Sequence, residues 1–82
     1  MMQRLREFLE HQLSSEIAEI LPKGSKYIVL DKDTLDVIAK IDKNEKFESL
    51  ALPDEILDKY ILSIRGDKFI GGFLITVTSS GA

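Results

Sequence analysis

The N-terminal part of the chain alternates apolar and polar positions with the period of a helix. Apolar residues recur at steps of three and four, which places them on one helical face. They are Leu5, Phe8, Leu9, Leu13, Ile17, Ile20 and Leu21. Pro22 and Gly24 end the pattern, since neither residue suits a helix interior. We therefore predict a helix whose apolar stripe packs on a sheet. The same stripe would also suit a dimer contact or the groove of a partner.

The next apolar segments favour β-structure. Residues 27–30 form a compact run of β-favouring side chains, which predicts a buried strand. Residues 35–42 are ambiguous. Their β-branched side chains favour a second strand, joined to the first by a turn at residues 31–34, whereas Asp33 or Thr34 would suit the N-cap of a short helix. We favour the hairpin because the segment is short and rich in β-branched residues.

After a turn at residues 42–45, the pattern predicts a third strand over residues 46–51. Pro53 and the two acidic residues behind it are typical of the start of a helix. Apolar residues continue at helical spacing to Ile64, and a strand over residues 60–65 is the alternative.

The last segment predicts one long strand over residues 68–78. Gly66 precedes it and suits the left-handed cap of the helix before. Gly71 and Gly72 lie inside the strand and indicate a bulge or a close approach of the backbone.

Together the segments predict a single globular α+β domain over residues 1–82, with the element order α-β-β-β-α-β. Short turns between successive strands favour a mostly antiparallel four-stranded sheet, with both helices packed on one face. A chain of 82 residues leaves no room for a second core.

Composition restricts the environment and the partners. The chain has no cysteine, which excludes disulfides and zinc–thiolate sites and favours a cytoplasmic protein. The longest nearly apolar run, residues 69–77, is about half the length of a membrane helix, so we expect no membrane span. The 11 basic residues are scattered among 14 acidic ones, which argues against nucleic acid as a partner. Scarce Asn and Gln beside abundant Ile, Leu, Lys and Glu are typical of thermophile proteins.

Catalytic groups are poorly supplied, and we expect no enzyme. His11 is the single histidine, and we expect it on the polar side of the first helix. Ser14 and Ser15 lie close to it only as neighbours on a helix surface, without an orienting carboxylate. The glycines match no phosphate-binding loop. A carboxylate site assembled only by the fold stays open.

One acidic segment offers coordination chemistry. Asp31, Asp33 and Asp36 fall within six residues around the first predicted turn, and Thr34 adds a hydroxyl. Hard cations such as Ca²⁺ or Mg²⁺ bind several oxygens on a flexible loop. However, the segment lacks the glycine and the final glutamate of an EF-hand, and aspartate is also a common turn residue.

These observations leave two hypotheses for function. The first is a small non-catalytic binding or structural module that acts through protein–protein contact, either with another protein or with a second copy. The second is a weak divalent-cation-binding protein that uses Asp31, Asp33 and Asp36 as ligands.

Overall fold

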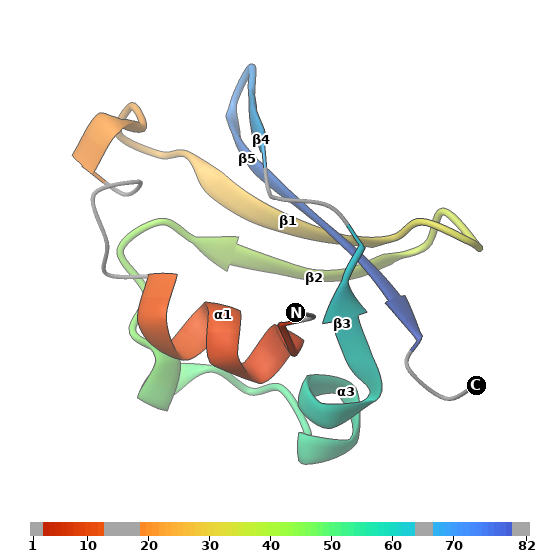
Figure 1. Cartoon of the computed structure of the whole chain (residues 1–82). Coiled ribbons are helices and arrows are strands. Elements are labelled where there is room, and N and C mark those ends of the chain that lie inside the picture. The colour runs from red at the N-terminus through yellow and green to blue at the C-terminus, as the bar shows by residue number, and fades with distance from the viewer. Residues whose placement is uncertain (1–2, 13–18, 64–66, 80–82) are drawn as a thin grey trace.

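A computed structural model of the chain describes residues 3–12, 19–63 and 67–79. Its elements follow one another as α1 (Leu5–Gln12), β1 (Lys26–Asp31), β2 (Val37–Asp42), a 3-10 turn (Phe47–Ser49), α3 (Asp54–Lys59), β3 (Tyr60–Leu62), β4 (Asp67–Phe69) and β5 (Gly72–Ser79). The five strands form one mixed sheet, and Figure 1 shows α1 and α3 on the same side of it. The predicted α+β class is therefore confirmed.

A single apolar cluster fills the space between the helices and the sheet. Its buried members are Leu5, Phe8, Leu9, Leu21, Tyr27, Val29, Ile41, Leu57, Tyr60, Phe73, Ile75 and Val77. The rings of Tyr27 and Phe73 meet edge to face, with centroids 6.0 Å apart. The predicted stripe of the first helix thus packs on the sheet through Leu5, Phe8 and Leu9.

The C-terminal part of the predicted helix is not fully borne out by the structure. Ile20 was expected in the apolar stripe, but 63% of its surface is exposed. Leu13 and Ile17 lie outside the described residues. The predicted helix is thus confirmed over Leu5–Gln12, and residues 19–20 are helical as well.

The order of the strands corrects the expected antiparallel meander. Neighbouring strands run β2-β1-β5-β3, and β4 also pairs with β5. The centre of the sheet is a parallel pair of β1 and β5, in register from Lys26 opposite Gly72 to Asp31 opposite Val77. The remaining pairs are antiparallel. Along β5, Phe73, Ile75 and Val77 are buried in the core, so the central strand also supplies much of the core-facing surface of the sheet.

The hairpin over residues 27–42 is confirmed. β1 and β2 pair antiparallel from Lys26 opposite Asp42 to Leu30 opposite Val37, with a register shift beside Val29. The helix alternative for residues 35–42 is therefore wrong.

The strand predicted over residues 46–51 is wrong. The segment forms a 3-10 turn in which Leu50 N–H donates to the Phe47 carbonyl at 3.1 Å, and no described strand pairs with it. Phe47 and Leu50 pack against the core instead. Their apolar side chains are partly buried, and the backbone of the segment makes its hydrogen bonds within the 3-10 turn and not with a neighbouring strand.

The second helix is shorter than predicted. α3 begins after Pro53, which is the N-cap and not the first helical residue, and its carbonyl accepts hydrogen bonds from Ile56 and Leu57. The chain becomes extended at Tyr60 and forms β3, so the strand alternative holds for residues 60–62. Gly66, the expected cap, lies outside the described residues.

The predicted strand over residues 68–78 is two strands. β4 and β5 form a tight hairpin, with Phe69 opposite Gly72. Gly71 turns the chain at a φ of 96°, a conformation that favours glycine. The glycine pair therefore marks a turn, while the expected close approach of the backbone is found at Gly72.

Gly72 lies directly beside β1. A Cβ atom at this position would collide with the backbone carbonyl of Lys26, which cannot move without breaking the β1–β5 ladder.

Within the described residues, no helix has the length and apolar character needed to cross a membrane.

We predict that Gly72→Ala lowers the free energy of unfolding by at least about 2 kcal/mol, because the added methyl group meets backbone and not a flexible side chain. Gly71→Asn is the matched control, since its Cβ would have open space and Asn tolerates positive φ. Urea unfolding of both variants measures the difference. Equal losses would show that close approach at Gly72 is not the constraint.

Candidate functional site

The acidic turn after β1 is organised around the Asp31 side chain. Asp31 is 6% exposed, and its Oδ1 accepts the N–H groups of Asp33 at 2.8 Å and of Thr34 at 3.2 Å. Its backbone carbonyl accepts Leu35 N–H at 2.8 Å, and Leu35 adopts a φ of 65°. The carboxylate therefore replaces the missing backbone partners of a tight turn.

The other two aspartates have different surroundings. Asp33 Oδ2 accepts the hydroxyl hydrogen of Thr78 on β5, at 2.6 Å between the oxygens. Asp36 lies exposed, its carbonyl accepts Asp31 N–H at 2.9 Å, and its own N–H donates to Thr34 Oγ1 at 3.2 Å. Asp31 and Asp33 thus build the turn and fasten it to β5.

Within residues 3–12, 19–63 and 67–79, no three His, Cys, Asp or Glu side chains form a group that could hold a metal ion. The contacts of Asp31 and Asp33 support the turn-forming interpretation of these residues. Cation binding by Asp31, Asp33 and Asp36 stays a prediction. His11 lies exposed in the last turn of α1.

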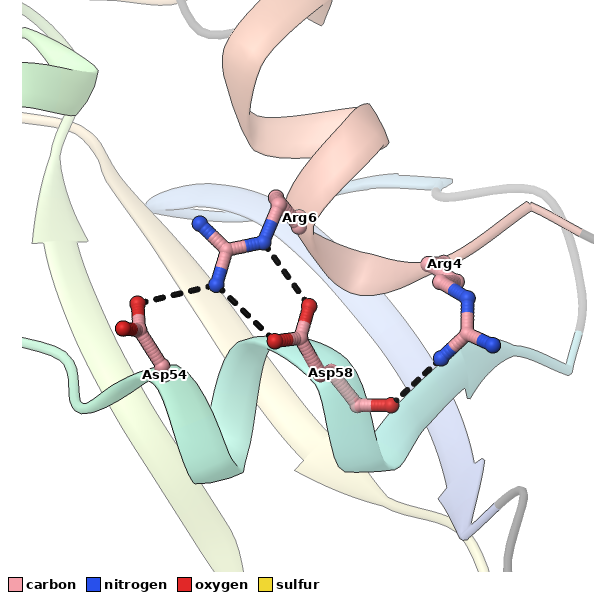
Figure 2. Close-up of polar contacts among 4 residues, drawn as sticks. All are labelled: Arg4, Arg6, Asp54 and Asp58. Atoms are coloured by element: carbon pink, nitrogen blue, oxygen red, sulfur yellow. Dashed lines mark hydrogen bonds and ion pairs between the residues drawn. The ribbon is translucent and has the colours of Figure 1, made fainter.

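The helices are joined by a charged cluster around Arg6, a residue that the sequence pattern did not single out. Arg6 on α1 reaches two aspartates of α3 (Figure 2): its Nε lies 2.8 Å from Asp58 Oδ1, and its Nη2 lies 2.9 Å from Asp54 Oδ1. Arg6 Nη2 also bonds Asp58 Oδ2 at 3.1 Å, which makes the Asp58 contact bidentate. Arg4 donates to the Asp58 backbone carbonyl at 2.8 Å.

These contacts change the ionisation of both partners. The hydrogen bonds from Arg6 hold the pKa of Asp58 below its ordinary value, against a smaller opposing effect of burial. The hydrogen bonds to Asp58, and then to Asp54, raise the pKa of Arg6. In the core, burial raises the pKa of the Tyr27 hydroxyl. All three effects follow from packing, and none creates a group that titrates near neutral pH.

One signal for this cluster is visible in the sequence. Asp54 and Asp58 are four residues apart on one helix, so they share a face and repel each other unless a cation lies between them. The identity of that cation, Arg6, depends on how the two helices pack. Only the tertiary structure could supply it.

The side of the sheet away from α1 and α3 carries a second apolar surface, which we call the outer face. Burial alternates along β1 and β5, so that successive side chains point to opposite sides. The outer face carries Ile28 opposite Leu74, Leu30 opposite Val37, and Phe69 opposite Gly72. Ile28, Leu30 and Leu74 are partly exposed, whereas Val37 is 51% and Phe69 42% exposed.

No described helix covers the outer face (Figure 1). The hairpin of β4 and β5 ends beside it at Ile70, which is fully exposed. Aliphatic side chains in a row along neighbouring strands differ from the scattered apolar residues of an ordinary surface. The arrangement suits contact with another apolar surface.

Two shallow depressions open elsewhere on the described part of the chain. One, of about 290 Å³, lies between β2 and residues 50–52 and includes Glu45. The other, of about 340 Å³, lies between residues 23–25 and residues 42–44. In the second, Lys43 Nζ donates to the Leu21 carbonyl at 2.7 Å and holds the two loops together.

Comparison of the chain with protein-family models, with curated proteins and with solved structures gives no match.

We predict that Arg6 and Asp58 stabilise the fold as a pair. In a double-mutant cycle of Arg6→Met and Asp58→Asn, each single variant should lower the stability, and the double variant should lose less than the sum. Asp54→Asn, at the more exposed contact, is the matched control and should show the smaller effect. Urea unfolding measures all of these differences, and strictly additive losses would contradict the pairing.

The sign of the pH dependence follows from the lowered pKa of Asp58. A carboxyl group whose pKa is lower in the folded state contributes stability above its unfolded pKa of about 3.9, and that contribution is lost as the pH falls through the folded pKa. The difference in stability between wild type and Asp58→Asn should therefore be constant near neutral pH and shrink in acid. A difference that grows on acidification would contradict the assignment.

Titration with Ca²⁺ and with Mg²⁺ tests the cation hypothesis. If the turn binds a cation, backbone amide shifts will be confined to residues 31–36 and their contacts on β5, and Asp33→Asn will abolish them. Asp42→Asn, a change at an aspartate away from the turn, is the control. If the shifts are absent or spread over all acidic residues, the hypothesis is wrong.

Proposed function

We propose that this protein is a small non-catalytic binding module that acts through protein–protein contact, with the outer face of the sheet as its contact surface. The observation that carries the proposal is the row formed by Ile28, Leu30 and Leu74, which lies on the side away from both helices. These side chains are separate from the core cluster, so core packing does not account for their apolar character.

The rim of this row suits a protein partner. Thr76 and Thr78 lie on the same side of β5, and Lys26 forms an ion pair with Asp42 at 2.6 Å. An apolar centre with polar groups around it is the usual anatomy of a protein–protein interface. We place the module in the cytoplasm, because a domain of this size without cysteine has no disulfides to stabilise it in an oxidising compartment.

Site-specific photo-crosslinking in the source organism tests the proposal. A photoreactive residue at Ile28 or at Leu74 should give the same adduct from both positions, because both lie on one face. The matched control is Glu55, which is exposed on α3 in the helical layer. Leu30→Lys in the same chain should remove the adduct by placing a charge in the contact.

The purified protein, irradiated alone, identifies a second copy as the partner if it gives an adduct of twice the mass. Amide spectra of the Leu30→Lys chain show that the fold is kept. If Ile28 and Leu74 give no more adduct than Glu55, the outer face is not a contact surface and the proposal is wrong.

A further inference from the structure

β2 forms one edge of the sheet. It pairs with β1 on one side, and no described strand pairs with it on the other. Such an edge leaves backbone N–H and C=O groups available to an additional strand.

Two hydrogen bonds show which backbone groups of β2 point away from β1. Lys43 N–H donates to the Ser25 carbonyl at 3.1 Å, so Lys43 points its N–H toward the β1 side. Asp42 instead offers its carbonyl to Glu45 N–H at 3.0 Å, in the turn that follows. Because the direction alternates along an antiparallel ladder, Lys40 also points its backbone groups away from β1. Outside the strand pairing itself, no backbone hydrogen bond joins Lys40 to another described residue.

A groove runs along this edge. The 290 Å³ depression touches four consecutive residues of β2, from Ile38 to Ile41. Their side chains alternate between the two faces of the sheet, so a depression that touches all four must follow the edge. Leu50 and Leu52 line its other wall, and both also pack against the core.

The charges beside the groove indicate what would fit there. Lys40 is exposed and forms no ion pair with any residue that the structure describes, whereas Asp42 on the same face already pairs with Lys26. Glu45 lines the groove itself and is only partly exposed. A carboxylate is therefore favoured opposite Lys40 and disfavoured inside the groove, where Leu50 and Leu52 offer apolar contact.

We propose that the edge of β2 binds an extended peptide segment of another protein as an added strand. The segment carries an acidic residue opposite Lys40, between two aliphatic residues that lie over Leu50 and Leu52. Main-chain hydrogen bonds to Lys40 supply the binding, and the alternating side chains supply the selectivity. The inference goes beyond the proposed function, because it assigns a second contact surface together with a kind of partner and a mode of contact.

A second copy of the chain fits this edge less well. Antiparallel pairing of β2 with itself through its outward residues places Lys40 opposite Lys40, or Lys40 opposite Asp42, whose carbonyl is already engaged in the turn. The first arrangement opposes like charges, and the second requires the turn at residues 42–45 to open. A different chain avoids both costs.

The test uses the purified protein and an end-capped peptide of sequence Thr-Val-Glu-Val-Thr. We expect saturable amide shifts at residues 38–41 and 50–52, with a dissociation constant of about 1 mM or tighter, since the free edge is short. The same peptide N-methylated at its glutamate lacks one backbone donor and should lose the binding. Lys40→Pro removes the outward N–H and should weaken binding at least about tenfold.

Lys40→Gln is the matched control, because it removes the charge and keeps the N–H. It should weaken binding less than Lys40→Pro, and it keeps the test decisive if Lys40→Pro fails to fold. A peptide with lysine in place of glutamate should bind Lys40→Glu better than wild type.

The proposal is overturned if the N-methylated peptide binds as well as the unmodified one, or if the peptide causes no amide shifts. It is also overturned if the amides of β2 shift with protein concentration in the absence of peptide, because two copies of the chain then pair through this edge. Shifts confined to Ile28 and Leu74 would overturn it while supporting the outer face as a contact surface. Failure of photo-crosslinking at the outer face bears on the proposed function and leaves the result at the β2 edge readable by itself.

Discussion

The parallel pairing of β1 with β5 is the contact on which the rest of the structure depends. Lys26 N–H donates to the Gly71 carbonyl at one end, and Lys32 N–H donates to the Val77 carbonyl at the other. Between these bonds, the core-facing residues of both strands form the floor on which α1 and α3 pack. Gly72 makes the pairing possible, because a side chain there would meet the Lys26 carbonyl. Since the two strands lie far apart in sequence, the sheet is complete only when the C-terminal strand has returned to the first.

The parallel pair also decides which surfaces are left for binding. With β5 inserted beside β1, β2 is displaced to an edge, and a groove lined by residues 50–52 runs along that edge in place of another strand. Both helices cover one side of the sheet, which leaves Ile28, Leu30 and Leu74 without a helical partner among the described elements. The proposed contact face and the proposed peptide edge are thus two consequences of one topology.

The charged residues with specific contacts in this structure stabilise turns and helix packing. Asp31 and Asp33 were selected from the sequence as cation ligands, and the structure uses their oxygens to close the turn and to hold Thr78. Arg6 was not selected, yet it forms the bidentate contact between the two helices (Figure 2). Local spacing identified the aspartates correctly as turn residues. It could not identify Arg6, because an ion pair across 52 positions exists only once the helices have packed.

The sequence by itself determined the local elements: the apolar face of the first helix, the hairpin of residues 27–42, the start of a helix behind Pro53, and the α+β class. Each rests on periodicity or on turn chemistry, which acts within a few residues. The tertiary structure alone decided that residues 46–51 form no strand, that residue 60 leaves the helix for β3, and that the glycines near residue 71 turn the chain into a hairpin. In the last two cases the same side chains suit either conformation, and the decision is made by a neighbouring strand that takes the backbone hydrogen bonds. That neighbour is β5, which the chain reaches last.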